Sequence, residues 1–154
     1  MKAIALSVAV ALAGTAGGAW AQQQACRDDA TSPPGTLHDA ALAMAQAVDR
    51  AQAPQLAQLW RQATPVTHAA VTEQQFVESV QNARRPLGQL QRRDWIRVEL
   101  MDIQAQDGAV APGRYVSVGF RSRFAGGPAE ELVSFRRDDD CQWRFAGYIV
   151  APTG

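Results

Sequence analysis

The stretch FVESVQNARRPLGQLQRR, residues 76–93, decides the fold, because a helical pattern ends within it and a strand pattern begins. Its first half repeats apolar residues at the spacing of one helix face, namely Phe76, Val77, Val80 and Ala83. Pro86 cannot continue a helix, and Gly88 permits the tight turn that leads into a strand. We therefore expect helices before Pro86 and strands after Gly88.

Both ends of this helix carry their own signals. Thr72 is followed three residues later by Gln75, the spacing of a capping box at a helix start. Arg84 and Arg85 fall in the last turn, where positive side chains interact favourably with the helix dipole. The helix is therefore expected to begin at Thr72 and to end at Pro86.

Two more helices are predicted upstream. Apolar residues recur at helical spacing from Leu37 to Val48, and Thr36 is a plausible N-cap for that segment. Pro54 suits the first turn of a second, short helix, and Pro65 is expected to end it. The residues between Pro65 and Thr72 are expected to form a connection.

Downstream, apolar and polar residues alternate in four segments, at residues 92–104, 114–124, 130–137 and 142–150. In the second segment one face is apolar, with Val116, Val118, Phe120 and Phe124. The opposite face is polar and is expected to be solvated, with Tyr115, Ser117, Arg121 and Arg123. The order of elements predicts an α+β domain: three N-terminal helices packed on one face of a four-stranded antiparallel meander.

The first residues are typical of a secretory leader. Lys2 supplies a positive charge, residues 3–13 are apolar, and residues 19–21 form an A-x-A cleavage site. We expect a signal peptide over residues 1–21, an N-terminal arm over 22–36 and a single α+β domain over 37–151. The early glycines disfavour a membrane anchor, and residues 23–25 do not resemble the apolar lipobox that lipid attachment at Cys26 requires. A periplasmic or secreted protein, with no membrane span after cleavage, is the expectation.

The charges are balanced, with 15 basic and 15 acidic residues. This balance argues against nucleic-acid binding, which depends on a concentrated positive field. The arginine pairs at 84–85, 92–93 and 136–137 are more simply interpreted as solvated surface.

Two cysteines in an exported chain predict one disulfide, Cys26–Cys141, that joins the N-terminal arm to the last hairpin. A redox-active pair would need close spacing or an activating base, and neither is visible. Two free thiols are the alternative.

Candidate catalytic and metal-binding residues are few. The two histidines, His38 and His68, are not spaced as metal ligands, and no metal or cofactor is expected. The conceivable acid–base dyad is His68 beside Asp102 or Glu99, although an exposed loop histidine and surface carboxylates explain these residues more simply. The acidic run at 138–140 lacks the pattern of a calcium loop and predicts a hairpin turn.

Five aromatic residues have two possible roles: Trp60, Trp95, Trp143, Phe145 and Tyr148. They could line a ligand pocket, but in a domain of this size we favour filling of the core. The hydroxyl of Tyr148 would need a hydrogen-bond partner if it is buried.

Two blocks resemble a known bacterial family, the domain of unknown function 4019. The first block, RRPLG followed by QRR, contributes Arg84, Pro86, Leu87, Gly88 and Arg93. The second block, QWRFAGY, contributes Trp143, Arg144, Gly147 and Tyr148. The similarity runs from about residue 40 to residue 150.

The resemblance implies an exported bacterial protein with a small cup-like fold, similar to the nuclear-transport-factor-2-like or cystatin-like cups. It brings no assigned activity and no catalytic residues. The sequence departs from the family at the final hairpin, where residues 138–141, DDDC, replace an Asp-Gly turn. Gly147, within the last strand, is expected to let a neighbouring side chain or backbone come close.

Two functions of different classes follow. The first is a non-catalytic periplasmic binding or accessory module, with a modest apolar groove between its helices and sheet. The alternative is a small cup-fold hydrolase or isomerase acting on an apolar small molecule, which is an analogy from fold alone. The arginines and Tyr115 on the polar sheet face also suit a homodimer interface.

Overall fold

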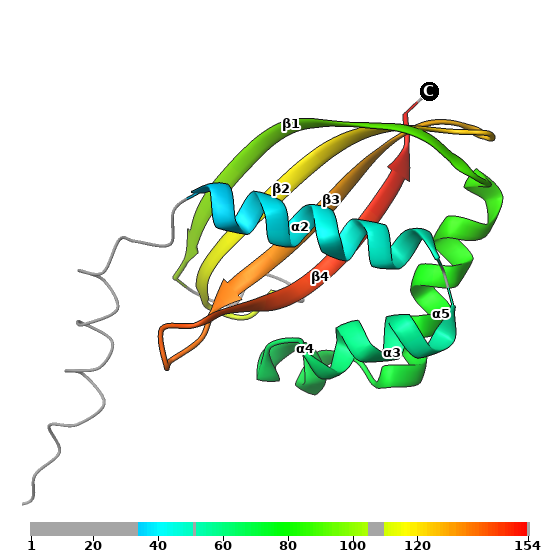
Figure 1. Cartoon of the computed structure of the whole chain (residues 1–154). Coiled ribbons are helices and arrows are strands. Elements are labelled where there is room, and N and C mark those ends of the chain that lie inside the picture. Colours follow the sequence, from blue (N-terminus) through cyan, green and yellow to red (C-terminus); the bar gives the residue numbers. More distant parts are fainter. Residues whose placement is uncertain (1–33, 51, 105–109, 154) are drawn as a thin grey trace, which may run out of the picture. The chain divides into compact units, whose positions relative to one another are not determined.

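The computed structural model of the chain describes residues 34–50, 52–104 and 110–153. Four helices come first: α2 (Pro34–Asp49), α3 (Ala53–Arg61), α4 (Pro65–Ala70) and α5 (Glu73–Arg84). A 3-10 turn, η1 (Arg85–Leu87), leads to the strands β1 (Leu90–Ile103), β2 (Gly113–Phe124), β3 (Gly127–Arg137) and β4 (Trp143–Pro152). The α+β class is confirmed, with helices followed by a sheet (Figure 1).

The sheet is an antiparallel meander in the order β1-β2-β3-β4. Val118 of β2 pairs with Val98 of β1 and with Val133 of β3, so these side chains share one face. We call this the inner face, because α2 packs across it. The register of β1 shifts twice, between Leu90 and Arg92 and between Trp95 and Arg97. These irregularities bend the strand at one edge of the sheet.

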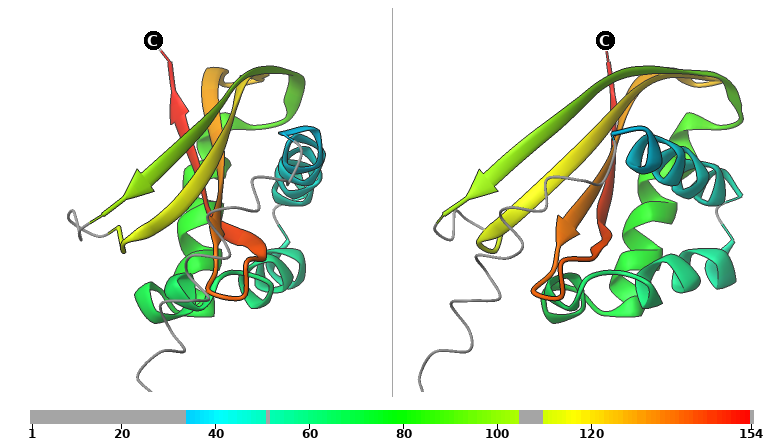
Figure 2. Two further views of the ribbon diagram at one scale, coloured as in Figure 1. Left: turned by 90° about the vertical axis from the view of Figure 1, so that its left-hand side faces the viewer. Right: turned by 60° about the vertical axis from the view of Figure 1, so that its left-hand side comes forward.

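The helices pack against different parts of the sheet. Helix α2 contacts β1, β2 and β3, whereas α4 and α5 contact β4 (Figures 1 and 2). Helix α3 packs against α2 and α5. The main core lies between these layers and includes Ala41, Ala45, Leu56, Phe76, Val118, Phe120, Val133 and Phe145. Burial of this apolar surface is what holds the helices on the sheet.

Two helix boundaries differ from the sequence prediction. Helix α2 begins at Pro34, so Thr36 lies inside the helix and is not its N-cap. Proline is well suited to the first helical position, since its fixed φ fits and its missing N–H is not needed there. The same effect explains the missed helix: α3 already ends at Arg61, and Pro65 begins α4 behind a Thr64 cap.

The other helix signals are confirmed. Thr72 and Gln75 form the capping box of α5, with both reciprocal hydrogen bonds present. Pro86 lies in η1, and Gly88 follows it with φ +69°. Side chains rarely adopt this backbone conformation, so glycine is required at the entry to β1.

The polar face of β2 is less exposed than its sequence suggests. Tyr115 and Ser117 are both buried, so their expected solvent exposure is wrong. The Tyr115 hydroxyl donates to the Ala111 carbonyl at 2.8 Å, and Ser117 bonds Ser134 of β3 at 2.8 Å. Arg121 and Arg123 are exposed as expected.

The expected close approach at Gly147 is also wrong. A Cβ atom added there would meet no atom within 4 Å. Gly147 pairs with Ser134 at a register shift in which Ala146 has no partner on β3. Its role is therefore to accompany a bulge in β4. Separately, none of the described helices is long and apolar enough to cross a membrane.

Candidate functional site

Each strand contributes one polar side chain to a buried cluster on the inner face. Arg93 comes from β1, Ser122 from β2, Glu131 from β3 and Tyr148 from β4. Arg93 pairs directly with Ser122 in the register, and Glu131 lies two residues from Ser122's partner Ala129 on β3. The strand alternation therefore turns these groups toward one point.

Arg93 links two carboxylates at this point. It donates to Glu131 at 2.7 and 2.8 Å and to Asp49, at the end of α2, at 2.9 and 2.9 Å. Both are two-point contacts of the kind that a planar guanidinium favours. The Arg93 side chain is 5% exposed and Glu131 is fully buried. This cluster joins α2 to β1 and β3 through charge.

Glu131 is further saturated by hydroxyl groups. Tyr148 donates to Glu131 Oε1 at 2.6 Å, and Ser122 donates to Oε2. Burial alone raises the pKa of Glu131, but the hydrogen bonds from Arg93, Ser122 and Tyr148 outweigh it, so the pKa is lowered. Burial, together with the Glu131 charge, raises the pKa of Tyr148 well above its usual range. These two groups therefore keep their protonation states near neutral pH, which suits a structural role better than acid–base catalysis.

Three residues of the family motif meet here, Arg84, Arg93 and Tyr148. Arg84 Nη2 donates to Asp49 Oδ1 at 3.1 Å, and the Arg84 side chain is 5% exposed. The prediction of a solvated surface is therefore wrong for one member of each of the first two arginine pairs. In β1 the alternation places Arg92 in solvent, 74% exposed, and Arg93 inside.

The other motif residues support the chain elsewhere. Leu87 is buried in a second small core with Phe124 and Ala129. Its carbonyl accepts a hydrogen bond from Gly126 N at 2.8 Å, which ties η1 to the β2–β3 turn. Trp143 packs against the edge of the main core.

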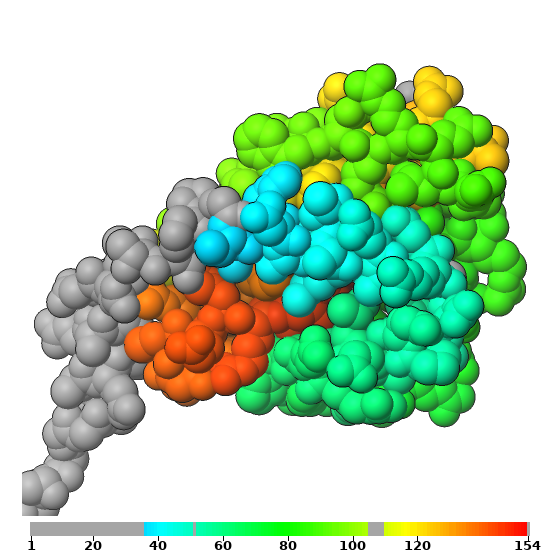
Figure 3. All heavy atoms as spheres, viewed as in Figure 1, coloured from blue at the N-terminus to red at the C-terminus, as the bar shows by residue number. Residues whose placement is uncertain are grey.

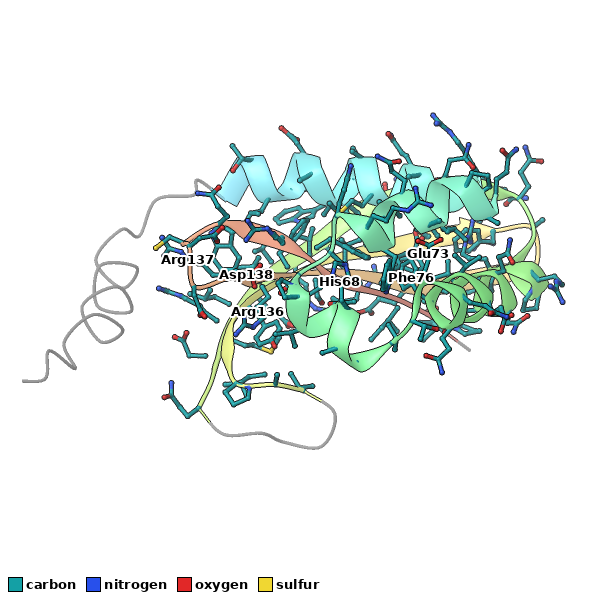
Figure 4. The ribbon with its side chains drawn as sticks, turned by 90° about the horizontal axis from the view of Figure 1, so that it is seen from below. His68, Glu73, Phe76, Arg136, Arg137 and Asp138 are labelled. Carbon is teal, nitrogen blue, oxygen red and sulfur yellow. The ribbon has the colours of Figure 1, made fainter. Side chains whose placement is uncertain are left out.

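Arg144 belongs to a second cluster, centred on buried Asp138. Asp138 accepts hydrogen bonds from Arg136 at 2.8 Å, from Arg144 at 2.9 Å and from Thr64 Oγ1 at 2.6 Å. Asp138 and Arg136 are labelled in Figure 4. The Thr64 amide also donates to the Phe145 carbonyl at 2.8 Å. The start of α4 is thereby fixed to the β3–β4 hairpin.

The hairpin turn predicted at residues 138–141 is confirmed, since Cys141 N donates to Asp138 O at 2.9 Å. Cys141 has φ +66°, a conformation that glycine adopts more readily. A cysteine therefore occupies a turn position whose backbone conformation favours glycine. Its predicted partner Cys26 lies outside the described residues, so the disulfide stays a prediction.

The structure does not assemble the conceivable acid–base dyad. His68 lies exposed on α4, where its Nε2 bonds the Trp60 carbonyl at 2.7 Å (Figure 4). Asp102 and Glu99 lie exposed on β1, beside Arg114 and Arg97 respectively. Within the described part of the chain, no group of three or more His, Cys, Asp or Glu residues could hold a metal ion.

Most of the aromatic residues fill the core as expected. Phe145 is buried, and Trp60, Trp143 and Tyr148 pack against the main cluster. Trp95 is the exception, because it is 54% exposed beside the His38 ring.

A groove lies between α2 and α3, which are neighbours on the surface shown in Figure 3. Its volume is about 570 Å³, within the usual range of ligand sites. Helix α2 contributes Ala40, Ala43, Met44 and Ala47, and the chain from α3 to the residue after it contributes Pro54, Gln55, Gln58, Leu59 and Gln62. None of these lining residues is charged.

One residue that lines the groove has an unsatisfied polar atom. The side-chain oxygen Oε1 of Gln55 is buried and has no hydrogen-bond partner among the described residues. Buried acceptors are normally paired, and this oxygen is closed to solvent, so a donor on a ligand reaches it only when the Gln55 side chain turns toward the groove. Asp49, Glu131 and Thr64 were missed from sequence, and the groove lies between two helices rather than between the helices and the sheet, where it was expected. The one available signal was Glu131, a charged residue at an inward position of an otherwise apolar strand face.

The comparisons with known proteins agree with the motif blocks. A family model described as "Protein of unknown function (DUF4019)" matches residues 40–148. No curated protein matches the sequence.

Proposed function

Since the chain belongs to the family of unknown function DUF4019, whose description assigns no activity, we propose its function from its own residues. The protein is a non-catalytic binding module that holds an uncharged, mainly apolar molecule in the α2–α3 groove. The observation that carries this proposal is the composition of the groove wall. Its residues are either apolar, such as the alanines, Met44 and Leu59, or neutral glutamines.

The glutamines narrow the class of ligand. Gln55, Gln58 and Gln62 follow one another at helical spacing, so their amides form a polar row along an apolar floor. A side-chain amide both donates and accepts hydrogen bonds, and because it is uncharged it suits donor and acceptor groups alike. The Gln55 oxygen, once its side chain turns toward the groove, would accept a hydrogen bond from a ligand donor. The ligand therefore has an apolar body and at least one hydroxyl or N–H group.

The proposal includes the setting of the protein. The leader-like residues 1–21 support export to the periplasm or beyond, where the Cys26–Cys141 bridge would be stable. The helices-then-meander order is similar to nuclear-transport-factor-2-like and cystatin-like cups. The enzyme alternative loses its support here, because His68 and the two carboxylates lie in separate, exposed settings.

Binding can be measured with N-phenyl-1-naphthylamine, an uncharged fluorescent probe with an apolar body and one N–H. We expect the wild-type protein to bind the probe saturably. Ala43→Phe fills the groove from α2 and should weaken binding by about tenfold or more, equivalent to about 1.4 kcal/mol. Gln55→Met removes the unsatisfied acceptor and should weaken probe binding less than Ala43→Phe does.

The matched control is Gln46→Phe. Gln46 is exposed on the same helix but does not line the groove, so the same side chain is added outside it. Binding should be unchanged there, and also when His68, Asp102 and Glu99 are replaced together. Equal loss in Ala43→Phe and Gln46→Phe, or no saturable binding by the wild type, would refute the proposal.

A further inference from the structure

A second pocket lies where α2 and α5 end and η1 begins. It is lined by Asp49, Gln81, Arg84, Arg85 and Gly88, and its volume is about 330 Å³. It shares no lining residue with the α2–α3 groove. Two of its residues are arginines and one is a carboxylate, so its walls carry a positive excess.

Arg84 is incompletely satisfied in this pocket. Its Nη2 donates to Asp49, and its guanidinium carbon lies 4.2 Å from the centre of the Phe124 ring. Its Nε and Nη1 atoms are buried and have no hydrogen-bond partner among the described residues. Leaving buried donors of a charged group unpaired is costly. The pocket wall thus includes a residue whose buried donors lack an acceptor.

Asp49 does not supply that acceptor. Its Oδ1 accepts from both Arg84 and Arg93, and its Oδ2 accepts from Arg93. Glu131 is bonded to Arg93, Ser122 and Tyr148. The acidic groups of the neighbourhood are therefore committed mainly to Arg93, and Arg84 receives one contact. Arg85 is exposed and forms no ion pair in the described residues.

We propose that this pocket binds a small oxyanion, the carboxylate or phosphate group of a ligand, on Arg84 and Arg85. Guanidinium groups are well matched to such oxygens, because their donors are planar and always charged. The orphan atoms of Arg84 are closed to solvent, so the anion reaches them when a rim side chain shifts. Exposed Arg85 is the rim residue that can both admit the anion and pair with it.

The test is an NMR titration that observes the Nε–H groups of the arginines. Inorganic phosphate and acetate are added in separate arms at constant ionic strength. We expect a saturable shift of the Arg84 signal in at least one arm. Saturation by phosphate alone assigns a phosphate group, saturation by acetate alone assigns a carboxylate, and saturation by both supports the shared oxyanion chemistry.

Arg85→Gln is the informative variant, because Arg85 is exposed and the core cluster stays intact. It should weaken anion binding about tenfold, whereas the control Arg123→Gln, exposed on β2, should leave it unchanged. The proposal is overturned if Arg84 shows no saturable shift in either arm. It is equally overturned if both variants weaken binding alike, or if a high-resolution structure with phosphate and acetate places only water on Arg84. Probe binding in the α2–α3 groove is measured separately, so either site can fail without the other.

Discussion

Glu131 shows how a single buried charge is made tolerable. Removing a carboxylate from water costs several kcal/mol, and an unpaired one would be neutralised by a raised pKa. Here Arg93 supplies the opposite charge, and the hydroxyl groups of Ser122 and Tyr148 satisfy the remaining lone pairs. Each partner comes from a different strand, so the charge also helps to fix the sheet register.

The hydroxyl of Tyr148 should therefore matter more than that of Tyr115. Tyr148→Phe removes a donor to a buried carboxylate and should lower the free energy of unfolding by about 1.5–3 kcal/mol. Tyr115→Phe removes a donor to a neutral carbonyl and should cost about 1 kcal/mol. Urea unfolding measures the free energy of unfolding of both variants. A smaller loss in Tyr148→Phe than in Tyr115→Phe would contradict the account.

The raised pKa of Tyr148 predicts a loss of stability in alkali. Burial and then the Glu131 charge raise the pKa of this hydroxyl above its ordinary value of 10.0, so the folded state keeps a proton that the unfolded chain releases. The stabilisation is fully present below pH 10.0 and declines by about 1.4 kcal/mol per pH unit above it. Unfolding free energies at about pH 9 and about pH 11 measure this decline. Tyr148→Phe should reduce it, and an equal decline in that variant would count against Tyr148.

At the scale of elements, the turn between β2 and β3 fits closely against η1. Gly126 N donates to Leu87 O at 2.8 Å, and Ala125 N donates to Gln89 O at 2.9 Å. A Cβ atom at Gly126 would lie 2.7 Å from the Pro86 carbonyl oxygen. This is a backbone atom, so it cannot turn away as a flexible side chain would.

Two glycine substitutions should consequently differ. Gly126→Ala forces η1 and the turn apart and should cost about 1–3 kcal/mol, as overpacking does. Gly147→Ala meets open space at a bulge and should be neutral, or stabilising by up to about 1 kcal/mol. The melting temperatures of the two variants, measured by thermal unfolding, test this difference. Similar melting temperatures would show that the contact at Gly126 relaxes.

The sequence predicts local structure well where each signal is local. The capping box at Thr72, the stop at Pro86 and the alternation in β2 need only neighbouring residues, and all three predicted their elements. Pro65 misled because proline can both end and begin a helix, and the start of α2 was predicted too late because Pro34 was assigned to the N-terminal arm. Thr64 is the N-cap of α4, and this cap would have indicated that Pro65 begins a helix rather than ends one.

The candidate site could not be predicted in the same way, because its contacts join residues far apart in the chain. Arg93 meets Asp49 across 44 positions, and Thr64 meets Asp138 across 74. From sequence, an arginine pair on a surface and one with a buried member look alike. The α2–α3 groove depends on how two helices pack, which no local pattern specifies.

For the whole molecule, the Cys26–Cys141 bridge remains the prediction with the largest effect. A loop of this length would stabilise the fold by about 4–5 kcal/mol on the chain-entropy model. Peptide mass spectrometry without reductant should detect the linked pair in protein purified from the periplasm. Cys141→Gly should then lower stability less than chain entropy alone implies, since Cys141 holds φ +66°. Detection of two free thiols would refute the bridge.

The two edges of the sheet differ in how they meet other molecules. Along β4, Ala63 forms a bridge with Phe145, so part of that edge is already covered by the chain itself. Strand β1 lies at an edge of the sheet, next to β2. A long flat edge strand invites edge-to-edge pairing with other copies of the protein. Two features of β1 oppose such pairing: its two register shifts and its alternating charges, among them Arg92, Asp94 and Arg97. The irregularity of β1 therefore protects the protein against aggregation through its longest strand.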